Sequence, residues 1–422
     1  MTTSVRMSLS PDLSPPAPAP PARRWPRVIW ALLVGTFIAR AAGFAFPFLG
    51  FRLAELGFST QLIGRTIAVF GAGWLVGQLV CGWLSDRLGR RTTLIGAMLA
   101  AAVALPVLAI AESTVSVVAS AAVAGIVYDA HRPIVSATIQ DQIPTEADRT
   151  LASGWRHFAI NIGAAATGAV GGMLAADTGM SVLFGVNAIA CAAVALIAHV
   201  FMPREKRPTA TGRPARRAYR RALRDLRLWL VCLASFCALN AAAAMFTWLP
   251  MLMAVDGLDA SAYGWTQVAT AAVVVLVTPV LMPFLGRRAD GPTPMVGHFA
   301  LSSLILGVGM GAASLADTTL QYSLAAGVAV TGEVILFVAA GDLIGKISPP
   351  EARGLYAGVW GTQLALPVIT SPILASWAIE TGGELLAAAV ICTAGLLGAA
   401  LCLPLRALLR PAPAVPDASP RS

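Results

Sequence analysis

The sequence predicts an all-α membrane protein in which twelve transmembrane helices form two pseudo-symmetric six-helix bundles. Three observations support this fold class. Hydrophobic residues make up 57% of the 422 residues and charged residues only 12%, whereas a soluble domain is about 25% charged. The apolar residues gather in twelve segments that are each long enough to cross a bilayer. Two loops of the first half also recur in the second half at one fixed offset.

The twelve apolar segments are expected to be helices. A membrane span needs about 20 apolar residues, and lipid offers the backbone no hydrogen-bond partner, so that an apolar run can cross only as a helix. In the first half the segments are residues 28–50, 60–84, 92–110, 114–139, 149–175 and 179–201. In the second half they are residues 228–252, 261–285, 294–315, 318–345, 353–379 and 384–408.

The predicted loops alternate between basic and acidic. Because basic loops stay inside the cell, the alternation predicts a multi-pass protein of the cell inner membrane with both termini in the cytoplasm. The net charge of +9 is thus explained by topology rather than by nucleic-acid binding. The basic side carries Arg23, Arg24, Arg27, Arg87, Arg90, Arg91, Arg287, Arg288, Lys346, Arg353, Arg406 and Arg410. The other side carries Glu112, Asp177, Asp256, Asp259, Asp317, Glu380 and Glu384.

Composition divides the chain into five parts. A disordered cytoplasmic tail (1–27) precedes the first six-helix bundle (28–201), and a basic cytoplasmic linker (202–227) leads to the second bundle (228–408) and a second disordered tail (409–422). The two bundles are repeats of one another. Asp86 and Asp290 are 204 positions apart, as are Arg149 and Arg353. Two parallel repeats related by an axis along the membrane normal are typical of transporters.

The loop between segments 2 and 3 carries the most specific motif, Gly82-Trp-Leu-Ser-Asp86-Arg87-Leu-Gly89-Arg90-Arg91. It resembles the G-x-L-a-D-r-x-G-r-r signature of the major facilitator superfamily. The glycines are expected to allow close helix approach and a tight turn, and Asp86 to face a helix N-terminus. The resemblance implies a latch between the two halves on the cytoplasmic side, with Asp141 as the acidic partner of Arg90.

The second half carries a degraded copy of this motif. It retains Gly286 and Asp290, but Gly291 and Pro294 stand where Arg87 and Arg90 stand in the first copy. The latch is therefore expected to be asymmetric.

Two further segments are similar to a bacterial drug:proton antiporter branch of the superfamily. Segment 4 contains the pair Arg132-Pro133, and segment 5 reads Gly163-Ala-Ala-Ala-Thr167-Gly168-Ala-Val-Gly171-Gly172. The antiporter signature of segment 5 has a glycine at the position of Thr167 and a proline at the position of Gly168. Small residues also allow tight helix packing, which is the structural interpretation of this stretch.

Five polar residues are expected near the bilayer centre: Arg40, Asp129, Arg132, Asn240 and Glu333. They fall on segments 1, 4, 7 and 10, which line the central cavity in the superfamily. Ionisable groups at this depth are energetically unfavourable and are functional candidates, and substrate sites lie near the midplane between repeats.

Asp129 and Glu333 occupy equivalent positions of the two repeats, 204 residues apart. Asp129 has Arg132 three residues later and is either a permanent ion pair or a titrating group. Glu333 has no cation near it in sequence, and a carboxyl group in that setting favours its protonated form and can gain and lose a proton. His131, two residues from Asp129, is expected to point away from that face.

These features predict secondary transport by alternating access, most plainly proton-coupled export of small amphipathic or drug-like compounds. Two alternatives remain open: a proton-coupled importer of a small organic anion held by Arg40 and Arg132, and a transport-inactive membrane scaffold or sensor. The expected partners are a small-molecule substrate and the lipid bilayer, with no nucleic acid and no second copy of the chain. No nucleotide-binding loop or catalytic motif indicates an enzyme. The six cysteines lack metal-ligand spacing, and no cofactor or metal beyond the proton gradient is expected.

Overall fold

The computed structural model describes residues 25–144, 146–204, 224–289, 291–349 and 353–409, which form helices and no strand. In the first half the helices are α1 (Arg27–Ala41), α2 (Ala45–Glu55), α3 (Thr60–Leu88), α4 (Arg90–Ile110), α5 (Thr114–Val127), α6 (His131–Gln142), α7 (Glu146–Thr178) and α8 (Met180–Phe201). In the second half they are α10 (Leu226–Val255), α11 (Ala260–Ala289), α12 (Val296–Ala313), α13 (Thr319–Ile347), α14 (Arg353–Gly361), the 3₁₀ turn η2 (Thr362–Leu364), α15 (Leu366–Ala400) and α16 (Cys402–Leu408).

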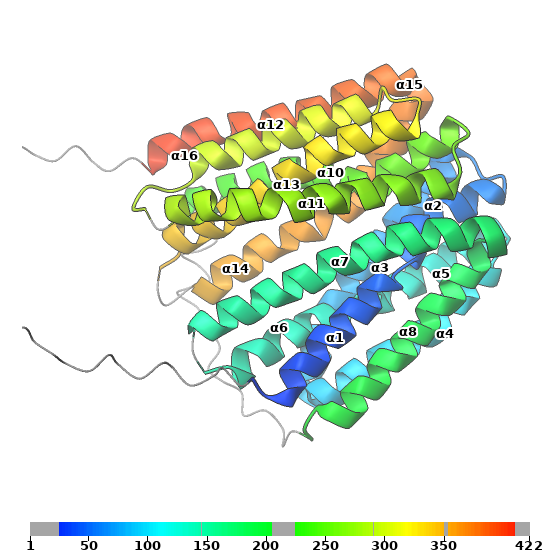
Figure 1. Cartoon of the computed structure of the whole chain (residues 1–422), viewed down its shortest axis with the longest axis horizontal. Coiled ribbons are helices and arrows are strands. Elements are labelled where there is room, and N and C mark those ends of the chain that lie inside the picture. The colour runs from blue at the N-terminus through cyan, green and yellow to red at the C-terminus, as the bar shows by residue number, and fades with distance from the viewer. Residues whose placement is uncertain (1–24, 145, 205–223, 290, 350–352, 410–422) are drawn as a thin grey trace, which may run out of the picture.

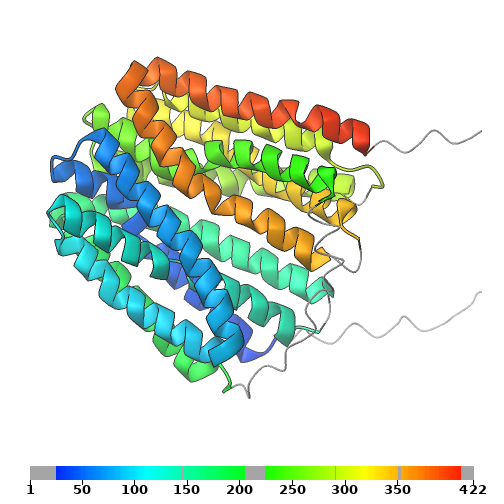
Figure 2. The ribbon, with the colours of Figure 1, turned by 180° about the vertical axis from the view of Figure 1, so that it is seen from behind.

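The expected fold class is confirmed. Among the described residues, eleven helical stretches are long and apolar enough to span a membrane. The last of them, Gly358–Leu408, has 51 residues, about 75 Å at 1.5 Å per residue, which is far more than a bilayer core of about 30 Å. Its backbone leaves the helical region at Gly382 and Gly383, where φ of Gly383 is +61°. The two arms fold back as a hairpin (Figure 2) and bring the number of crossings to twelve.

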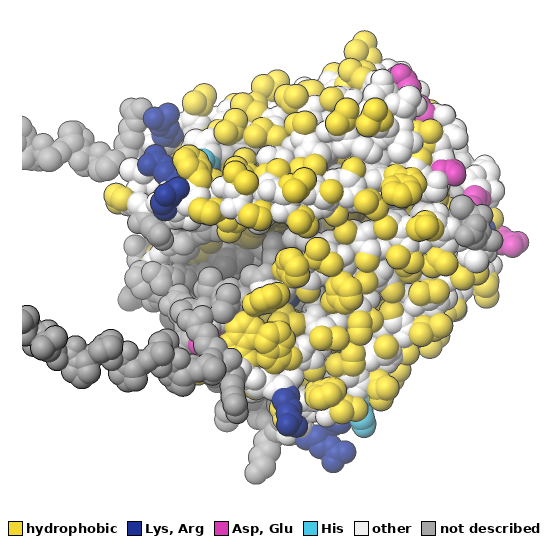
Figure 3. Space-filling model, viewed as in Figure 1, with side chains coloured by type: hydrophobic (Ala, Val, Ile, Leu, Met, Phe, Trp, Pro, Cys, Tyr) yellow, Lys and Arg dark blue, Asp and Glu magenta, His cyan; other side chains and the backbone are white. Residues whose placement is uncertain are grey.

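The two bundles lie side by side, and residues 25 and 409 lie at the same end of the molecule (Figure 1). We call this end the termini face and the opposite end the far face. Basic side chains gather at the termini face and acidic side chains mostly at the far face (Figure 3). The flanks between the two faces carry exposed hydrophobic side chains, for example Leu79, Ile189, Leu276 and Leu320. This distribution fits a bundle whose flanks contact lipid.

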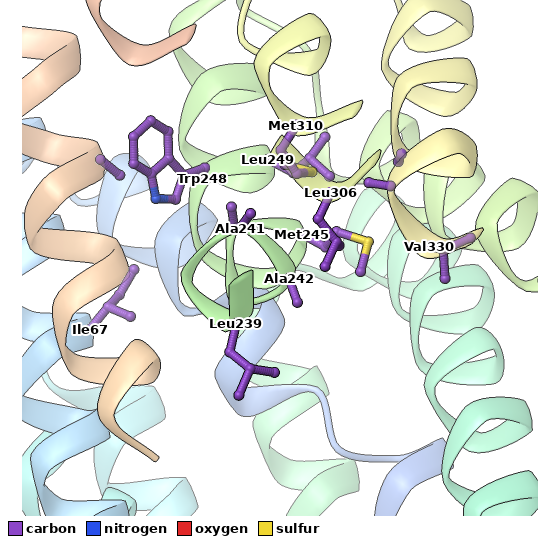
Figure 4. Close-up of a cluster of buried hydrophobic side chains, with 14 of the residues drawn as sticks. Ile67, Leu239, Ala241, Ala242, Met245, Trp248, Leu249, Leu306, Met310 and Val330 are labelled. Carbon is purple, nitrogen blue, oxygen red and sulfur yellow. The ribbon is translucent and has the colours of Figure 1, made fainter. Parts of the chain in front are cut away.

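The two halves are joined toward the far face. The larger hydrophobic core contains residues of both halves, and Figure 4 shows Ile67 of α3 among α10 side chains such as Leu239 and Trp248. A separate core, which includes Ile29, Leu94 and Ile139, belongs to the first half alone. Toward the termini face the surface is hollowed between the halves (Figure 3).

Glycines permit the closest approach between the halves. A Cβ atom added to Gly264 of α11 would collide with the backbone oxygen of Gly168 in α7, and one added to Gly172 would collide with α11. Backbone atoms cannot move aside as a flexible side chain can. These small residues of segment 5 thus pack α7 against α11 near the far face.

We expect Gly264→Val to open the far face. The added side chain should disfavour the packed arrangement by about 1–3 kcal/mol, the usual effect of overpacking, and so shift the protein toward the state that is open at the far face. The measurement is the distance between spin labels at positions 59 and 261, in protein whose native cysteines have been replaced. Gly185→Val is the control, because nothing lies within 4 Å of a Cβ atom at Gly185. Equal distance distributions for the two variants would contradict the expectation.

Candidate functional site

Two helices of the first half break near the middle of the membrane, and proline explains both breaks. In an α-helix the N–H of each residue donates to the carbonyl four residues earlier, and proline has no N–H. Pro47 therefore leaves the carbonyl of Gly43 without its helical donor, and Pro133 does the same for Asp129. The chain is non-helical between α1 and α2 and between α5 and α6, at these two carbonyls.

Side chains from other helices satisfy the two freed carbonyls. Tyr128 Oη donates to Gly43 O at 3.1 Å, and Gln78 Nε2 of α3 donates to Asp129 O at 2.9 Å. The two breaks thereby lie against each other. Asp129 is the one described non-glycine residue with positive φ, at +55°. Aspartate tolerates this left-handed conformation better than most residues, and the break directs its side chain into the bundle.

The side chain of Asp129 is only 3% exposed and lies between two basic groups. Arg132 Nε is 3.0 Å from Asp129 Oδ2, and His131 Nε2 is 3.5 Å from Asp129 Oδ1. Neither Arg132 Nε nor Asp129 Oδ2 has a partner in hydrogen-bond geometry, so the 3.0 Å contact is an ion pair lying off the N–H direction. The expectation that His131 points away from Asp129 is wrong. It assumed a continuous helix, whereas the break at residues 128–130 turns His131 back toward the carboxylate.

Two further arginines act electrostatically on Asp129. They are Arg40, in the last turn of α1, and Arg156 of α7. Arg156 donates to Ser136 Oγ, and the hydroxyl of Thr167 donates to the backbone oxygen of Arg40. Arg40 Nε is buried without a hydrogen-bond partner among the described residues. Sequence reasoning missed Arg156 because it placed the start of segment 5 at residue 149, whereas α7 begins at Glu146 and carries Arg156 almost three turns into the bundle.

Glu333 lies on α13 of the second half, which runs without a break through this position. Its side chain is partly exposed and makes no ion pair or hydrogen bond with the described residues. Arg40 acts on it electrostatically. Arg40 belongs to the other half, so the positive charge that acts on Glu333 comes from across the boundary between the halves. The sequence shows no basic residue near Glu333, and the basic residue that acts on it is Arg40 of α1.

Asn240 belongs to a different environment. Its amide Nδ2 donates to Phe236 O at 2.8 Å, and its Oδ1 accepts from Thr370 Oγ1 at 2.7 Å. The first bond lies within α10, and the second holds α10 against α15, so both stay within the second half. Four of the five predicted residues thus belong to one charged site, which also includes Arg156: Arg40, Asp129, Arg132 and Glu333. The amide of Asn240 takes part in helix packing instead.

The family assignment rests on the sequence profile of the Major Facilitator Superfamily, which matches residues 31–330, well over half of the chain. The chain belongs to the major facilitator superfamily. It is therefore a membrane transporter and not an enzyme. The Probable sulfoacetate transporter SauU of Cupriavidus necator is 24% identical over 356 residues, which are 78% of this chain and 81% of that protein.

Solved structures of the superfamily share the fold. A POT family transporter in complex with 5-aminolevulinic acid has a TM-score of 0.73 at 13% identity, covering 91% of this chain and 96% of that chain. The POT family transporter PepTSo has a TM-score of 0.70 at 16% identity, covering 91% and 99%. The nucleoside transporter NupG has a TM-score of 0.70 at 14% identity, covering 91% and 100%. At these identities the likeness shows the fold and nothing finer.

The superfamily motif lies at the turn from α3 to α4. Gly89, with φ of +84°, makes that turn, and Arg90 Nη2 is 2.6 Å from Asp141 Oδ2 at the end of α6. Arg91 Nη2 donates to His199 O at 2.7 Å, and the Arg87 guanidinium lies 4.2 Å from the ring centre of Trp83. The Arg90–Asp141 pair joins two helices of the same half, so its role as a latch between halves stays a prediction.

The remaining residues assigned to the latch are two glycines and two aspartates: Gly82, Gly286, Asp86 and Asp290. A Cβ atom added to Gly82 or Gly286 would meet nothing within 4 Å among the described residues. Gly82 therefore does not mark the close helix approach that we expected of it. The side chain of Asp86 and the whole of Asp290 lie outside the described residues.

In the second half, different residues hold the loop between α11 and α12, which corresponds to the turn between α3 and α4. Lys346 Nζ is 2.5 Å from Asp342 Oδ1 and donates to the backbone oxygens of Ala289 and Thr293. Asp342 Oδ2 accepts from the N–H of Met295 at 2.8 Å. This pair ties the end of α13 to the loop between α11 and α12, as Arg90 and Asp141 tie α6 to the start of α4. The sequence motif held no signal for Asp342 or Lys346, and the asymmetry of the latch itself stays a prediction.

Proposed function

We propose that the protein takes up a small organic anion together with protons. The observation that carries the proposal is the charge at the paired helix breaks. Arg132 forms an ion pair with Asp129, Arg40 and Arg156 act on Asp129 electrostatically, and Arg40 also acts on Glu333 of the other half. Three guanidinium groups against two carboxylates leave one positive charge, and two when Glu333 holds a proton. Uncompensated charge inside a protein is unfavourable, so the site favours an anion.

Proton coupling follows from the charge of the substrate. The interior of a cell is electrically negative, and moving one charge against the membrane potential requires about 2.3 kcal/mol per 100 mV. Uptake of an anion therefore needs a co-transported cation. In the mechanism that we propose, Glu333 binds a proton from outside, and the site then carries two positive charges and accepts a doubly charged anion. Both are released on the cytoplasmic side, so that each cycle moves one negative charge inward instead of two, and the pH gradient supplies the driving force through the proton.

The named relative agrees with this substrate class. SauU is described as a probable sulfoacetate transporter, and sulfoacetate carries a sulfonate and a carboxylate. Guanidinium groups bind such planar or tripodal oxyanions with two parallel hydrogen bonds. We propose a compound of this type, with one sulfonate or carboxylate at Arg40 and the other at Arg132. The chain is further proposed to act as a monomer in the cell inner membrane with the termini face in the cytoplasm.

Proton-coupled export of amphipathic or drug-like compounds is the second candidate. Its support is Glu333, a carboxyl group without an ion pair among the described residues, which suits a cationic substrate as well as a proton. A cation reaching Glu333 would, however, approach Arg40 and the other two arginines. The first proposal therefore fits the site better, and the drug:proton antiporter branch remains only a resemblance of segments 4 and 5.

Uptake into liposomes tests the proposal. With the liposome lumen more alkaline than the medium, the protein should accumulate a sulfonated carboxylate or a dicarboxylate but not a lipophilic cation. Arg40→Gln should raise the half-saturating concentration at least about thirtyfold, since losing one partner of a buried charge contact costs about 2–5 kcal/mol. Arg65→Gln, which removes an exposed arginine of α3, should leave uptake unchanged. Flux of the lipophilic cation alone would favour the export candidate, and no flux of any compound would favour the inactive scaffold.

A further inference from the structure

A cavity of ≈ 440 Å³ opens at the termini face of the second half, far from the paired helix breaks. Three basic side chains from three different elements line it. They are Arg288 in the last turn of α11, His298 in the first turn of α12 and Arg406 in α16. Basic side chains gather at this end of the second half in Figure 3. Sequence reasoning used these arginines for topology alone.

Two further features of the cavity, besides its basic side chains, favour an anion. No acidic side chain among the described residues lines it. The backbone N–H groups of Gly297 and His298, at the start of the 18-residue helix α12, have no hydrogen-bond partner among the described residues. The N-terminus of a helix presents such free N–H groups and a partial positive charge, which together favour phosphate.

The rim of the cavity is apolar on the side that faces lipid. Leu301 lines the cavity and is 50% exposed. Phe284 is 57% exposed, and its ring is tilted against the His298 ring with 6.2 Å between the centroids. Arg288 ends a membrane span, so the basic groups lie at the depth of lipid headgroups. A ligand held here contacts positive charge at one end and exposed hydrocarbon at the other.

We propose that this cavity binds an anionic phospholipid, with the phosphodiester between Arg288, Arg406 and the start of α12 and an acyl chain over Leu301 and Phe284. Basic pockets between helices on the cytoplasmic side are a known type of lipid-headgroup site. A free phosphate ion would use the same basic groups but would gain nothing from the apolar rim. The lipid accounts for both parts of the cavity.

Native mass spectrometry of the full-length protein tests the proposal. Wild type, R288Q/R406Q and R287Q are titrated with phosphatidylglycerol or phosphatidylcholine of equal chain length. We expect wild type to bind phosphatidylglycerol about 25-fold more tightly than R288Q/R406Q, since each arginine near an anionic surface contributes roughly fivefold. R287Q should bind like wild type, because Arg287 does not line the cavity and its Nε donates to Pro283 O at 3.2 Å.

Two additional measurements distinguish loss of charge from misfolding and a lipid site from a site for a free anion. R288K/R406K keeps both charges and should retain most of the binding, so that a loss in R288Q/R406Q reflects charge and not misfolding. Inorganic phosphate is added at millimolar concentration in a parallel series that records thermal stability. If phosphate stabilises the protein as much as phosphatidylglycerol does, the site takes a free anion and the lipid proposal is overturned. Equal losses in R287Q and R288Q/R406Q would overturn it as well, because the effect would then be general surface charge.

Discussion

Replacing Glu333 with Gln is expected to abolish proton-driven accumulation of the anion while leaving exchange of the anion across the membrane intact. Glutamine keeps the shape of the side chain but cannot gain or lose a proton, so each transport cycle would carry the anion alone. The loss of one co-transported proton should lower the accumulation ratio about fifty-fold through a potential of 100 mV, interior negative, since 100 mV corresponds to about 2.3 kcal/mol per charge. Each unit of the pH gradient should lower it by about a further tenfold.

The experiment compares two modes in the same liposomes. Accumulation is measured with a pH gradient and a potassium diffusion potential, and exchange is measured with unlabelled anion inside and labelled anion outside. Glu112→Gln is the control, because Glu112 is an exposed acid in the loop between α4 and α5. If Glu333→Gln still accumulates the anion like wild type, Glu333 is structural and Asp129 becomes the leading candidate for the proton site. If exchange is also lost, the carboxyl group is needed for binding and not for coupling alone.

Arg132→Gln is expected to destabilise the protein strongly, and Asp129→Asn in the same chain is expected to restore much of the loss. Removing Arg132 leaves the 3%-exposed Asp129 carboxylate without its ion-pair partner at 3.0 Å. Breaking a buried pair from one side costs about 3–5 kcal/mol, whereas replacing both partners is often close to neutral. We take the lower limit, because the Arg132 side chain is 28% exposed.

The native cysteines allow the thermal stability of these variants to be measured. Cys81, Cys191, Cys232 and Cys402 are free and buried, so a thiol-reactive dye reports thermal unfolding. About 3 kcal/mol should lower the unfolding midpoint by roughly 3–4 °C for a chain of 422 residues whose halves share one core. The control is again Arg65→Gln, which should shift the midpoint little. A double variant as unstable as Arg132→Gln alone would show that Arg132 stabilises the fold through contacts other than Asp129, for example with the Trp74 ring 5.7 Å away.

Much of the candidate site was predictable because charge is rare inside a membrane. Arg40, Asp129, Arg132 and Glu333 stand out against apolar neighbours, and all four lie at the helix breaks or face them. The pairing of Asp129 with Arg132 followed from a spacing of three residues. The motif at Gly89 and Arg90 was predictable because a tight turn and a charge pair need particular residues at particular positions. The same requirement makes the motif specific.

The rest of the site could not be predicted, because it depends on contacts between distant segments. Nothing near Glu333 in the sequence points to Arg40, which belongs to the other half. Pro47 and Pro133 are visible in the sequence, but only the packing of α5 against α3 shows that Gln78 and Tyr128 satisfy the carbonyls that the prolines free. His131 was misplaced because helical spacing does not hold across such a break.

The sequence by itself determined the membrane class, the twelve crossings, the division into halves and the superfamily. The physical reason is that lipid leaves the backbone no alternative to long apolar helices, whose lengths can be counted. The tertiary structure alone decided which charges meet, that Asn240 is used in packing, that Arg156 joins the site and that Arg288 and Arg406 share a cavity. Each of these depends on how helices rotate and pack against one another, and hydropathy does not specify that rotation.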